Sequence, residues 1–425
     1  MAHASHILGM NARNQLYASL NSEKAKRYGF SKFVAKEFLL KHGIPVAQLY
    51  GILYTYDELK KFDWNSIEGG FAVKPSNGSA GKGILVIKEK VKGRGWRDIT
   101  GRIHTLEDLR LHVSDILAGQ YSTWGTVRSA IVEERIPIHP DLEQYVTYGT
   151  PDVRVILLNK IPIMAMTRLP TKESGGRANL DQGAIGLGID MGTGKTIAGV
   201  TGKKHPIEFF PGNTISVKGI QIPFWLRVLR TAVRVANATG LRYMGADIFL
   251  HPEKGPMVAE VNAYPGLSIQ LANRVGLRRR LERVEGIEAR NVNHAVKIGQ
   301  SLFAENYPAF STGEDVPVLD IIETGELFGD LDVKREVRVL VNTGREQSAI
   351  AADVAEEMGL VDPQDLLWTQ QLAGEGKASV VEVKLKLHDR VIKTPMIVSK
   401  KLSGTKYDIH LGRANLEGFL IGVRE

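Results

Sequence analysis

The chain contains no cysteine, and aromatic residues make up 7% of its 425 residues. The lack of cysteine excludes disulfide scaffolds, thiolate zinc sites and cysteine nucleophiles. No run of residues approaches the roughly 18 consecutive apolar positions that a membrane-spanning helix needs. The first residues, from Met1 to His6, lack the basic-then-apolar pattern of a signal peptide. We therefore expect a soluble, cytoplasmic protein with no membrane partner.

Charge is distributed unevenly along the chain. From Asp315 to the end there are 14 Lys and Arg against 19 Asp and Glu, a balance of about −5, which leaves about +13 for the rest. The contrast predicts two units with different roles. A basic body suits nucleotide phosphates and carboxylate substrates as well as nucleic acid. Because the five tryptophans are scattered and form no stacking platform, we expect no nucleic-acid partner.

Apolar periodicity and turn residues predict an α+β fold for the basic part. After it, a segment with Ser311-Thr312-Gly313 among acidic residues is typical of a linker. The residues that follow alternate between apolar and polar, which predicts a β-rich second part. We expect a first domain over 1–310, a linker over 311–317 and a second domain over 318–425. In the first domain the predicted helices cover 31–44, 105–118, 224–239 and 291–304, and the predicted strands cover 71–75, 84–87, 130–134, 152–159, 162–168, 243–250 and 256–261.

A lysine at a strand end precedes a loop of small residues. Lys74 closes the strand Phe71-Ala72-Val73-Lys74-Pro75, and the loop runs from Ser76 to Gly83. Glycines let backbone N–H groups approach phosphates closely, and a lysine can meet phosphate oxygens as a point charge. An ordinary Gly-Ser turn is an equally simple interpretation of this loop taken alone.

Three oxygen-bearing side chains fall on a second strand pair, far along the chain. Strand alternation puts Glu260 and Asn262 on one face, and Asp247 lies on the preceding strand. Apolar neighbours such as Ile248 and Val261 argue against an exposed acidic edge, because unpaired buried carboxylates are costly. A few hard oxygen ligands are typical of Mg²⁺, which keeps waters and binds substrate phosphates. The sequence therefore predicts a magnesium site.

Together these segments resemble the ATP-grasp superfamily of carboxylate–amine ligases. The matching runs are residues 71–84, Ala246-Asp247-Ile248 and 260–267, and the opening Ile7-Leu8-Gly9-Met10-Asn11-Ala12-Arg13-Asn14 is similar to the glutamate-ligase-related branch, also called sugar-transfer-associated ATP-grasp. The resemblance covers residues 7–305. It implies two α+β subdomains, 31–130 and 131–305, that clasp ATP between them. The implied cofactors are ATP and Mg²⁺.

The resemblance also implies roles for individual residues. Lys32 and Lys74 are the nucleotide lysines, although Ser31 stands where relatives have aspartate. Arg154, Arg168 and Lys74 are the catalytic set, and the magnesium ligands are Asp247, Glu260 and Asn262. The nucleotide set is completed by the phosphate loop, the hinge that reads adenine, a ribose contact and a phosphate-side pair: Ser79, Gly81, Gly83, Glu133, Glu134, Ile136, Asp141, Arg177 and Asn179. An alternative for the ribose contact is Glu143.

The implied chemistry is amide or peptide bond formation through an acylphosphate. A carboxylate attacks the γ-phosphate of ATP, and an amine then displaces phosphate. Such transfer needs positioning and charge neutralisation rather than a side-chain nucleophile, in agreement with the absence of cysteine. By resemblance, the enzyme adds glutamate or another amino acid to a small-molecule or peptide carboxylate.

The C-terminal part resembles retropepsin-type aspartic proteases, including the group once described as ATP-dependent zinc proteases. The similarity lies in Asn342-Thr343-Gly344 and in Leu411-Gly412-Arg413 near the end. It implies a small all-β barrel and a homodimer, because retropepsins pair to bring two aspartates together. Asn342 replaces that aspartate, and an Asn–Asn pair has no titratable base. We therefore expect a silent domain, whether the asparagine is natural or introduced.

Two other functions stay open. The chain is either a ligase, as above, or a peptide-processing aspartic protease seen as an Asp-to-Asn variant, in which a nucleotide-dependent partner domain serves the protease. A third interpretation is an ATP-gated peptide-binding protein without turnover. Self-cleavage after Asn342→Asp would favour the second, and tight ATP binding without ADP release would favour the third.

Overall fold

The structure is a computed structural model that describes residues 6–77, 82–121, 128–146, 148–202, 204–304, 318–330, 333–372, 375–388, 390–416 and 419–422. The chain forms two compact units, Met1–Gly286 (unit 1) and Ile287–Glu425 (unit 2). Unit 1 contains a six-stranded and a seven-stranded sheet, and unit 2 contains a seven-stranded and a two-stranded sheet. Helices and strands occur in both units, so the predicted α+β class is confirmed. Among the described residues, no helix is long and apolar enough to cross a membrane.

Unit 1 begins with short helical segments that lead into the predicted 31–44 helix. The segments are α1 (Met10–Ala12), the π-helical turn η2 (Arg13–Tyr17), η3 (Ala18–Leu20), α2 (Glu23–Phe30) and α3 (Lys32–Lys41). The side chain of Ser31 caps α3 by accepting a hydrogen bond from the backbone of Val34. Gly43 follows with φ of 64°, a left-handed conformation that ends the helix. Ser31 and Gly43 bound the helix that the sequence predicts over 31–44.

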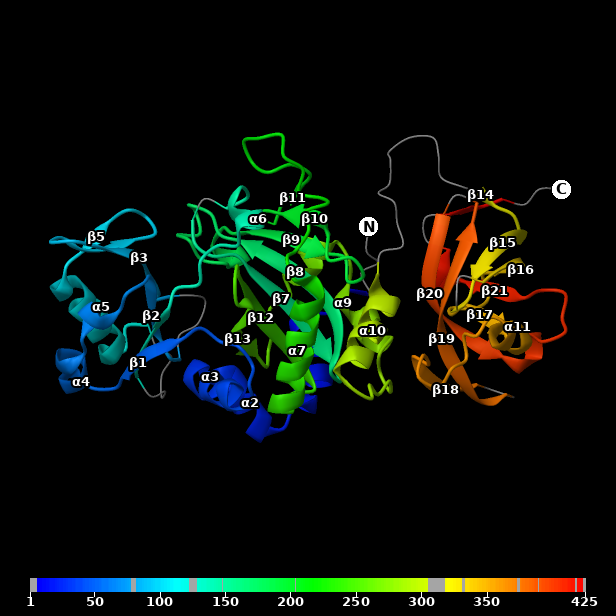
Figure 1. The fold of residues 1–425 in the computed structure, drawn as a ribbon, viewed down its shortest axis with the longest axis horizontal. Coiled ribbons are helices and arrows are strands. Elements are labelled where there is room, and N and C mark those ends of the chain that lie inside the picture. The colour runs from blue at the N-terminus through cyan, green and yellow to red at the C-terminus, as the bar shows by residue number, and fades with distance from the viewer. Residues whose placement is uncertain are drawn as a thin grey trace. The chain divides into compact units, whose positions relative to one another are not determined.

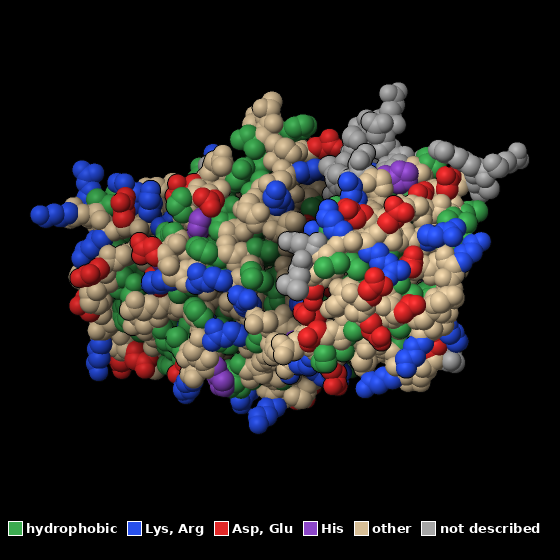
Figure 2. Space-filling view, turned by 45° about the vertical axis from the view of Figure 1, so that its right-hand side comes forward, with side chains coloured by type: hydrophobic (Ala, Val, Ile, Leu, Met, Phe, Trp, Pro, Cys, Tyr) green, Lys and Arg blue, Asp and Glu red, His purple; other side chains and the backbone are tan. Residues whose placement is uncertain are grey.

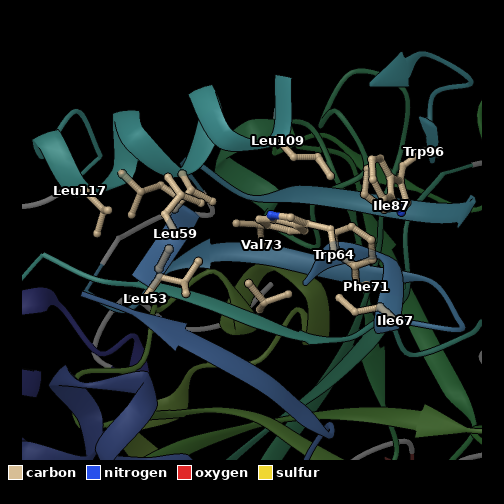
Figure 3. Close-up of a cluster of buried hydrophobic side chains, with 14 residues drawn as sticks. Leu53, Leu59, Trp64, Ile67, Phe71, Val73, Ile87, Trp96, Leu109 and Leu117 are labelled. Carbon is tan, nitrogen blue, oxygen red and sulfur yellow. The ribbon is translucent and has the colours of Figure 1, made fainter. Parts of the chain in front are cut away.

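The six-stranded sheet has the order β1-β6-β2-β3-β4-β5. Its strands are β1 (Leu49–Leu53), β2 (Phe71–Pro75), β3 (Leu85–Val91), β4 (Gly95–Asp98), β5 (Ile103–His104) and β6 (Ala130–Glu134). Three helical segments accompany it: α4 (Tyr56–Lys61), η4 (Trp64–Ser66) and α5 (Leu106–Ala118). Figure 3 shows Leu109 of α5 above Phe71 and Val73 of β2, with Trp64 between them. This apolar cluster fixes β2, and hence Lys74, against α5.

The seven-stranded sheet of unit 1 has the order β11-β10-β9-β8-β7-β12-β13. Its strands are β7 (Asp152–Leu158), β8 (Ile161–Leu169), β9 (Ile185–Ile189), β10 (Thr196–Val200), β11 (Pro206–Ile207), β12 (Tyr243–His251) and β13 (Gly255–Asn262). The associated helical segments are α6 (Pro140–Glu143), η5 (Leu180–Gln182), α7 (Trp225–Thr239), α8 (Ile269–Asn273) and α9 (Leu277–Glu282). Helix α7 packs against β7, β8, β12 and β13, and Figure 1 shows it lying along this sheet.

Two features of this sheet set the register of the site. Strands β7 and β8 form a hairpin whose turn residues Asn159 and Lys160 have φ of 48° and 72°, the geometry of a two-residue hairpin turn. Strands β12 and β13 are antiparallel, and Asp247 pairs opposite Glu260 on one side and opposite Arg154 on the other. The pairing of β12 with β13 has a register shift between Asp247 and Ile248.

Unit 2 contains α10 (Val292–Phe303) and a closed β-structure. Its elements are β14 (Val318–Leu319), β15 (Ile322–Phe328), β16 (Lys334–Asn342), β17 (Ala349–Ala351), α11 (Ala352–Glu357), β18 (Trp368–Leu372), β19 (Gly376–Leu387), β20 (Arg390–Ser399), η7 (Lys400–Leu402), β21 (Ile409–Gly412), η8 (Arg413–Asn415) and β22 (Leu420–Ile421). The main sheet has the order β15-β16-β21-β17-β20-β19-β18, and β15 also pairs with β19. That pairing closes the strands from β15 to β19 into a barrel, so a small β-barrel follows the first domain as expected.

The division between the units differs from the boundary expected at residue 310. The predicted helix 291–304 is α10, and it packs on β20 within unit 2. The Arg290 guanidinium, just before it, donates to the carbonyls of Pro363, Gln364 and Leu366 at 2.7–3.2 Å. An amphipathic pattern shows that a helix has a buried face but not which sheet covers that face. The expected linker 311–317 lies outside the described residues.

Candidate active site

Unit 1 holds a cavity of about 640 Å³ between its two sheets, walled by α3, β2, β6, β7, β12 and β13. Most of the residues predicted for the nucleotide, catalytic and metal roles line it, although they come from distant parts of the chain. These residues are Lys32, Lys74, Glu133, Glu134, Ile136, Arg154, Arg168, Arg177, Asn179, Asp247, Glu260 and Asn262. The fold therefore brings the two motif groups face to face across one space.

The remaining predicted residues lie elsewhere or outside the described residues. Ser79 and Gly81 fall outside the described residues. Gly83 has φ of 74°, and its carbonyl lies 3.0 Å from Nε2 of His112. Asp141 sits in the first turn of α6 with its side chain 70% exposed, so it does not join the cavity wall. A ribose contact from Asp141 would need a rearrangement, because a short surface helix holds its side chain toward solvent.

Lys74 does not stand alone at the end of β2. Its ammonium forms an ion pair with Glu133 of β6, and Lys36 of α3 pairs with the same carboxylate. All three residues are at most 8% exposed. Burial by itself would raise the pKa of Glu133, but Lys74 and Lys36 hold it below its ordinary value. Glu133 therefore contributes its carboxylate to the site, in addition to lying on the hinge strand β6.

A second buried charge network joins β7, β8 and β12. The Arg154 guanidinium donates two hydrogen bonds of 2.7 Å to Asp247, and Arg168 donates one of 2.8 Å to the same carboxylate. Arg168 also forms a bidentate pair with Asp152. Burial would raise the pKa of Asp247, but Arg154 and Arg168 hold it well below its usual range. Burial raises the pKa of Asp152 to about 6, against the opposing effect of Arg168.

The predicted metal ligands converge at the same place. The Asn262 amide lies 3.3 Å from the Asp247 carboxylate, to which it donates, and Glu260 lies 3.7 Å from the Lys32 ammonium. Among the described residues there is no group of three His, Cys, Asp or Glu side chains suited to a metal. Two carboxylates and one amide oxygen are nevertheless hard donors, and a set with few protein ligands fits Mg²⁺ bound together with phosphates. The residues present therefore fit the implied ion.

Apolar side chains form the part of the cavity near the hinge. Val46, Leu85, Ile136, Phe249 and Val258 line it. An apolar lining of this kind suits the base of a nucleotide. The loops after β8 add Arg177, which donates to Gln182 at 3.2 Å, and Asn179, whose side chain caps η5.

The sequence missed several cavity residues. Lys36 and Asp152 are the most consequential, and Asp98, Ile99 and Thr100 come from the turn after β4. Lys36 stands four positions after Lys32, so both lie on the same face of one helix. That spacing is a signal that could have identified Lys36. Asp152 stands two positions before Arg154 in the run Asp152-Val153-Arg154, but its partner Arg168 is met only through the β7–β8 register.

Comparison with solved structures finds matches at low identity and low TM-score. D-cycloserine synthetase DcsG is 14% identical with a TM-score of 0.34, and the match covers 61% of this chain and 70% of that one. D-alanine–D-alanine ligase from Bacillus anthracis is 15% identical with a TM-score of 0.34, covering 68% and 74%. ATP-grasp ligase PsnB complexed with a minimal precursor is 17% identical with a TM-score of 0.33, covering 63% of each chain. Two further matched structures are a complex of D-alanine–D-alanine ligase from Bacillus anthracis with ATP and a complex of PsnB with minimal precursor, Mg and ADP.

A search of curated proteins finds no match. A family model, sugar-transfer associated ATP-grasp, matches residues 11–286, which is more than half of the chain. The match ends where unit 1 ends. The chain therefore belongs to the sugar-transfer-associated ATP-grasp family.

Proposed function

We propose that unit 1 is an ADP-forming carboxylate–amine ligase that makes an amide or peptide bond through an acylphosphate. One observation carries the proposal: the cavity places Lys74 on one sheet and Asp247, Glu260 and Asn262 on the other. A nucleotide bound between the sheets would present its phosphates to cations and metal ligands at once. Phosphoryl transfer needs mainly this positioning and neutralisation.

The steps assign roles to residues that the cavity already holds. The substrate carboxylate attacks the γ-phosphorus, the bond to the β-phosphate oxygen breaks, and ADP leaves. The amine nitrogen then attacks the acyl carbon, inorganic phosphate leaves and the amine loses a proton. Lys74 and Arg154 neutralise charge on the transferred group, and Arg168 keeps Asp247 ionised and oriented. Asp247, Glu260 and Asn262 would hold Mg²⁺, which supplies Lewis-acid neutralisation of the phosphates when bound.

The substrates we propose are an amino acid, such as glutamate, as amine and a small-molecule or peptide carboxylate as acid. Support comes from Arg177, which lines the cavity and donates to the neutral side chain of Gln182, whereas Arg154 and Arg168 are already paired with Asp247 and Asp152. Guanidinium groups bind carboxylates in a bidentate fork, so Arg177 favours an anionic substrate.

ADP release with Mg-ATP, measured against a matrix of amino acids, dipeptides and hydroxy or dicarboxylic acids, tests the ligase. We expect release that requires both a carboxylate and an amine and that disappears in Glu260→Ala. The Glu260 side chain is 37% exposed, so its removal should leave folding intact. Measurable ATP binding without release for any pair would instead support the ATP-gated binding protein.

For unit 2 we propose a retropepsin-like domain that is silent in this chain and pairs with a second copy. Support comes from the parallel pairing of β16 with β21, which sets Asn342 opposite Gly412, and from Arg413, which donates to the Thr343 carbonyl at 2.6 Å. Asn342 is half-buried, whereas Thr343 and Gly344 are exposed. The loop is thus presented to a partner, but without the carboxylate that would activate water.

Asn342→Asp tests that interpretation of unit 2. The change restores one carboxylate per copy, so two paired copies are needed for an active dyad. We expect peptide hydrolysis or self-cleavage that increases more steeply than linearly with protein concentration, with an optimum at acidic pH. The unchanged chain is the control and should be inactive. Silence of the variant across peptides and pH, in a protein shown to be dimeric by sedimentation, would count against the retropepsin-like assignment.

A further inference from the structure

Three buried ionisable side chains meet at the end of β2, and the proposed mechanism uses one of them. Lys74 of β2 and Lys36 of α3 both pair with Glu133 of β6, Lys36 through Oε2 and Lys74 through Oε1. Lys36 also donates a hydrogen bond of 2.9 Å to the carbonyl of Ala47. Two of its donor positions are thereby fixed, so Lys36 is held in place rather than free to turn toward a ligand.

Lys36, Lys74 and Glu133 form a trio whose net charge decides how strongly Lys74 can attract an anion. A Lys74–Glu133 pair alone is neutral, and a neutral pair attracts a phosphate weakly. With Lys36 included, two ammonium groups share one carboxylate and the trio carries one net positive charge. Because the groups are buried, water screens that charge little. Lys36 therefore offsets Glu133, and the positive charge of Lys74 remains available to an anion in the cavity.

We propose that Lys36 is a positioning residue for nucleotide binding: it holds Glu133 and supplies the charge that lets Lys74 act on the phosphates of ATP. This inference rests on the proposed function, since it takes ATP as the ligand of the cavity. It adds a residue that contacts Lys74 through a shared carboxylate. Helix α3 then contributes at both ends of the site, because Lys32 at its start pairs with Glu260.

The environment of Lys36 gives the arrangement a pH dependence. Burial lowers the pKa of Lys36 to about 8, against the opposing effect of Glu133, while Lys74 lowers it further. Lys36 is protonated below that value and loses its proton above it. An anionic ligand favours the protonated form, so ATP affinity should be highest below about pH 8 and should fall as pH rises through it. The charged groups that act on Lys36 are Glu133 and Glu134 of β6 and Lys74 of β2. Tyr28 of α2 and Glu260 of β13 line the same cavity.

The test measures the dissociation constant of Mg-ATP by titration calorimetry on the full chain, without any acceptor substrate. We expect Lys36→Met to weaken binding by roughly tenfold or more, because the trio loses its net charge. Lys36→Arg keeps a charged donor and should stay within about threefold of the unchanged protein. Lys36→Met combined with Glu133→Gln restores one net positive charge on Lys74, so binding should recover from the level of Lys36→Met.

The pH profile separates a charge role from a packing role. For the unchanged protein we expect the dissociation constant to rise roughly fivefold between pH 7 and pH 9. Lys36→Arg should flatten that rise, because arginine stays protonated over this range. A merely structural residue would give additive damage in the double variant and no change in the pH profile.

The outcomes are distinct. If Lys36→Met and Lys36→Arg bind Mg-ATP as tightly as the unchanged protein, or if the double variant binds no better than Lys36→Met, the positioning role is overturned while the ligase proposal stands. If the unchanged protein binds no Mg-ATP, the proposed function fails and the role of Lys36 fails with it. Should Lys36→Met not fold, Lys36→Arg and its pH profile still decide the question.

Discussion

Asp247→Asn is expected to slow ADP release strongly and to lower the melting temperature of the protein at the same time. The Asp247 carboxylate is 2% exposed and accepts hydrogen bonds from Arg154 and Arg168. Removing its charge leaves the Arg154 guanidinium buried without its anion, a change that costs about 3–5 kcal/mol in comparable pairs. It also removes one proposed Mg²⁺ ligand, so we expect activity to fall by roughly a thousandfold.

A matched variant separates the two effects of that change. Glu260→Gln alters a second proposed metal ligand, but its side chain is 37% exposed and its partner Lys32 lies 3.7 Å away. Exposed pairs contribute about 0–1 kcal/mol, so this variant should lose activity and keep its melting temperature. Thermal unfolding and ADP release are measured on both proteins. An Asp247→Asn protein as stable as the unchanged one would show that the buried network does not hold the second sheet together.

Lys74→Met should reduce kcat by roughly a hundredfold and raise the KM for ATP by about tenfold, with little change in stability. The ammonium of Lys74 lies in the cavity wall and is the proposed cation for the transferred phosphoryl group. Its removal does not strand a buried charge, because Glu133 keeps its ion pair with Lys36. Stability should therefore depend on Lys74 less than on Asp247.

Steady-state ADP release at varied ATP, together with thermal unfolding, checks this prediction. Lys88→Met is the control: Lys88 is an exposed residue of β3 and does not line the cavity. It removes the same charge from the same sheet and should leave kcat and KM unchanged. Equal losses in both variants would indicate a general effect of charge rather than a contact with the nucleotide. Figure 2 shows acidic and basic side chains interspersed on the visible surface, so a single exposed lysine is a modest change.

Local sequence patterns identified the elements that carry the site but not all of its members. The strand ending in Lys74 and the alternation of Glu260 with Asn262 are short-range features, and the structure places all three in the cavity wall. Asp141 does not line the cavity. Its position a few residues after the hinge strand does not determine the direction in which the short helix α6 points its side chain. Lys36 was missed because its spacing after Lys32 was not used, and a lysine on a helix resembles a surface residue until its buried partner Glu133 is known.

The boundary between the units shows the same contrast between local sequence patterns and contacts of distant residues. The sequence identified the amphipathic helix 291–304 and assigned it to the first domain, whereas the structure packs α10 on β20. Which apolar surface a helix covers depends on contacts between residues far apart in sequence. Local periodicity contains no information about those contacts.

The sequence by itself determined which groups are available to this protein: no thiol, Lys32 and Lys74, the Asp247, Glu260 and Asn262 set proposed for Mg²⁺, and an asparagine rather than an aspartate at position 342. Only the tertiary structure decided how those groups are oriented and which of them form ion pairs. Strand register set Asp247 opposite both Glu260 and Arg154, and burial made Lys36, Lys74 and Glu133 share one net charge. The reason is physical: residue type and spacing fix side-chain identity and local direction, whereas pairing and desolvation arise only when distant segments pack together.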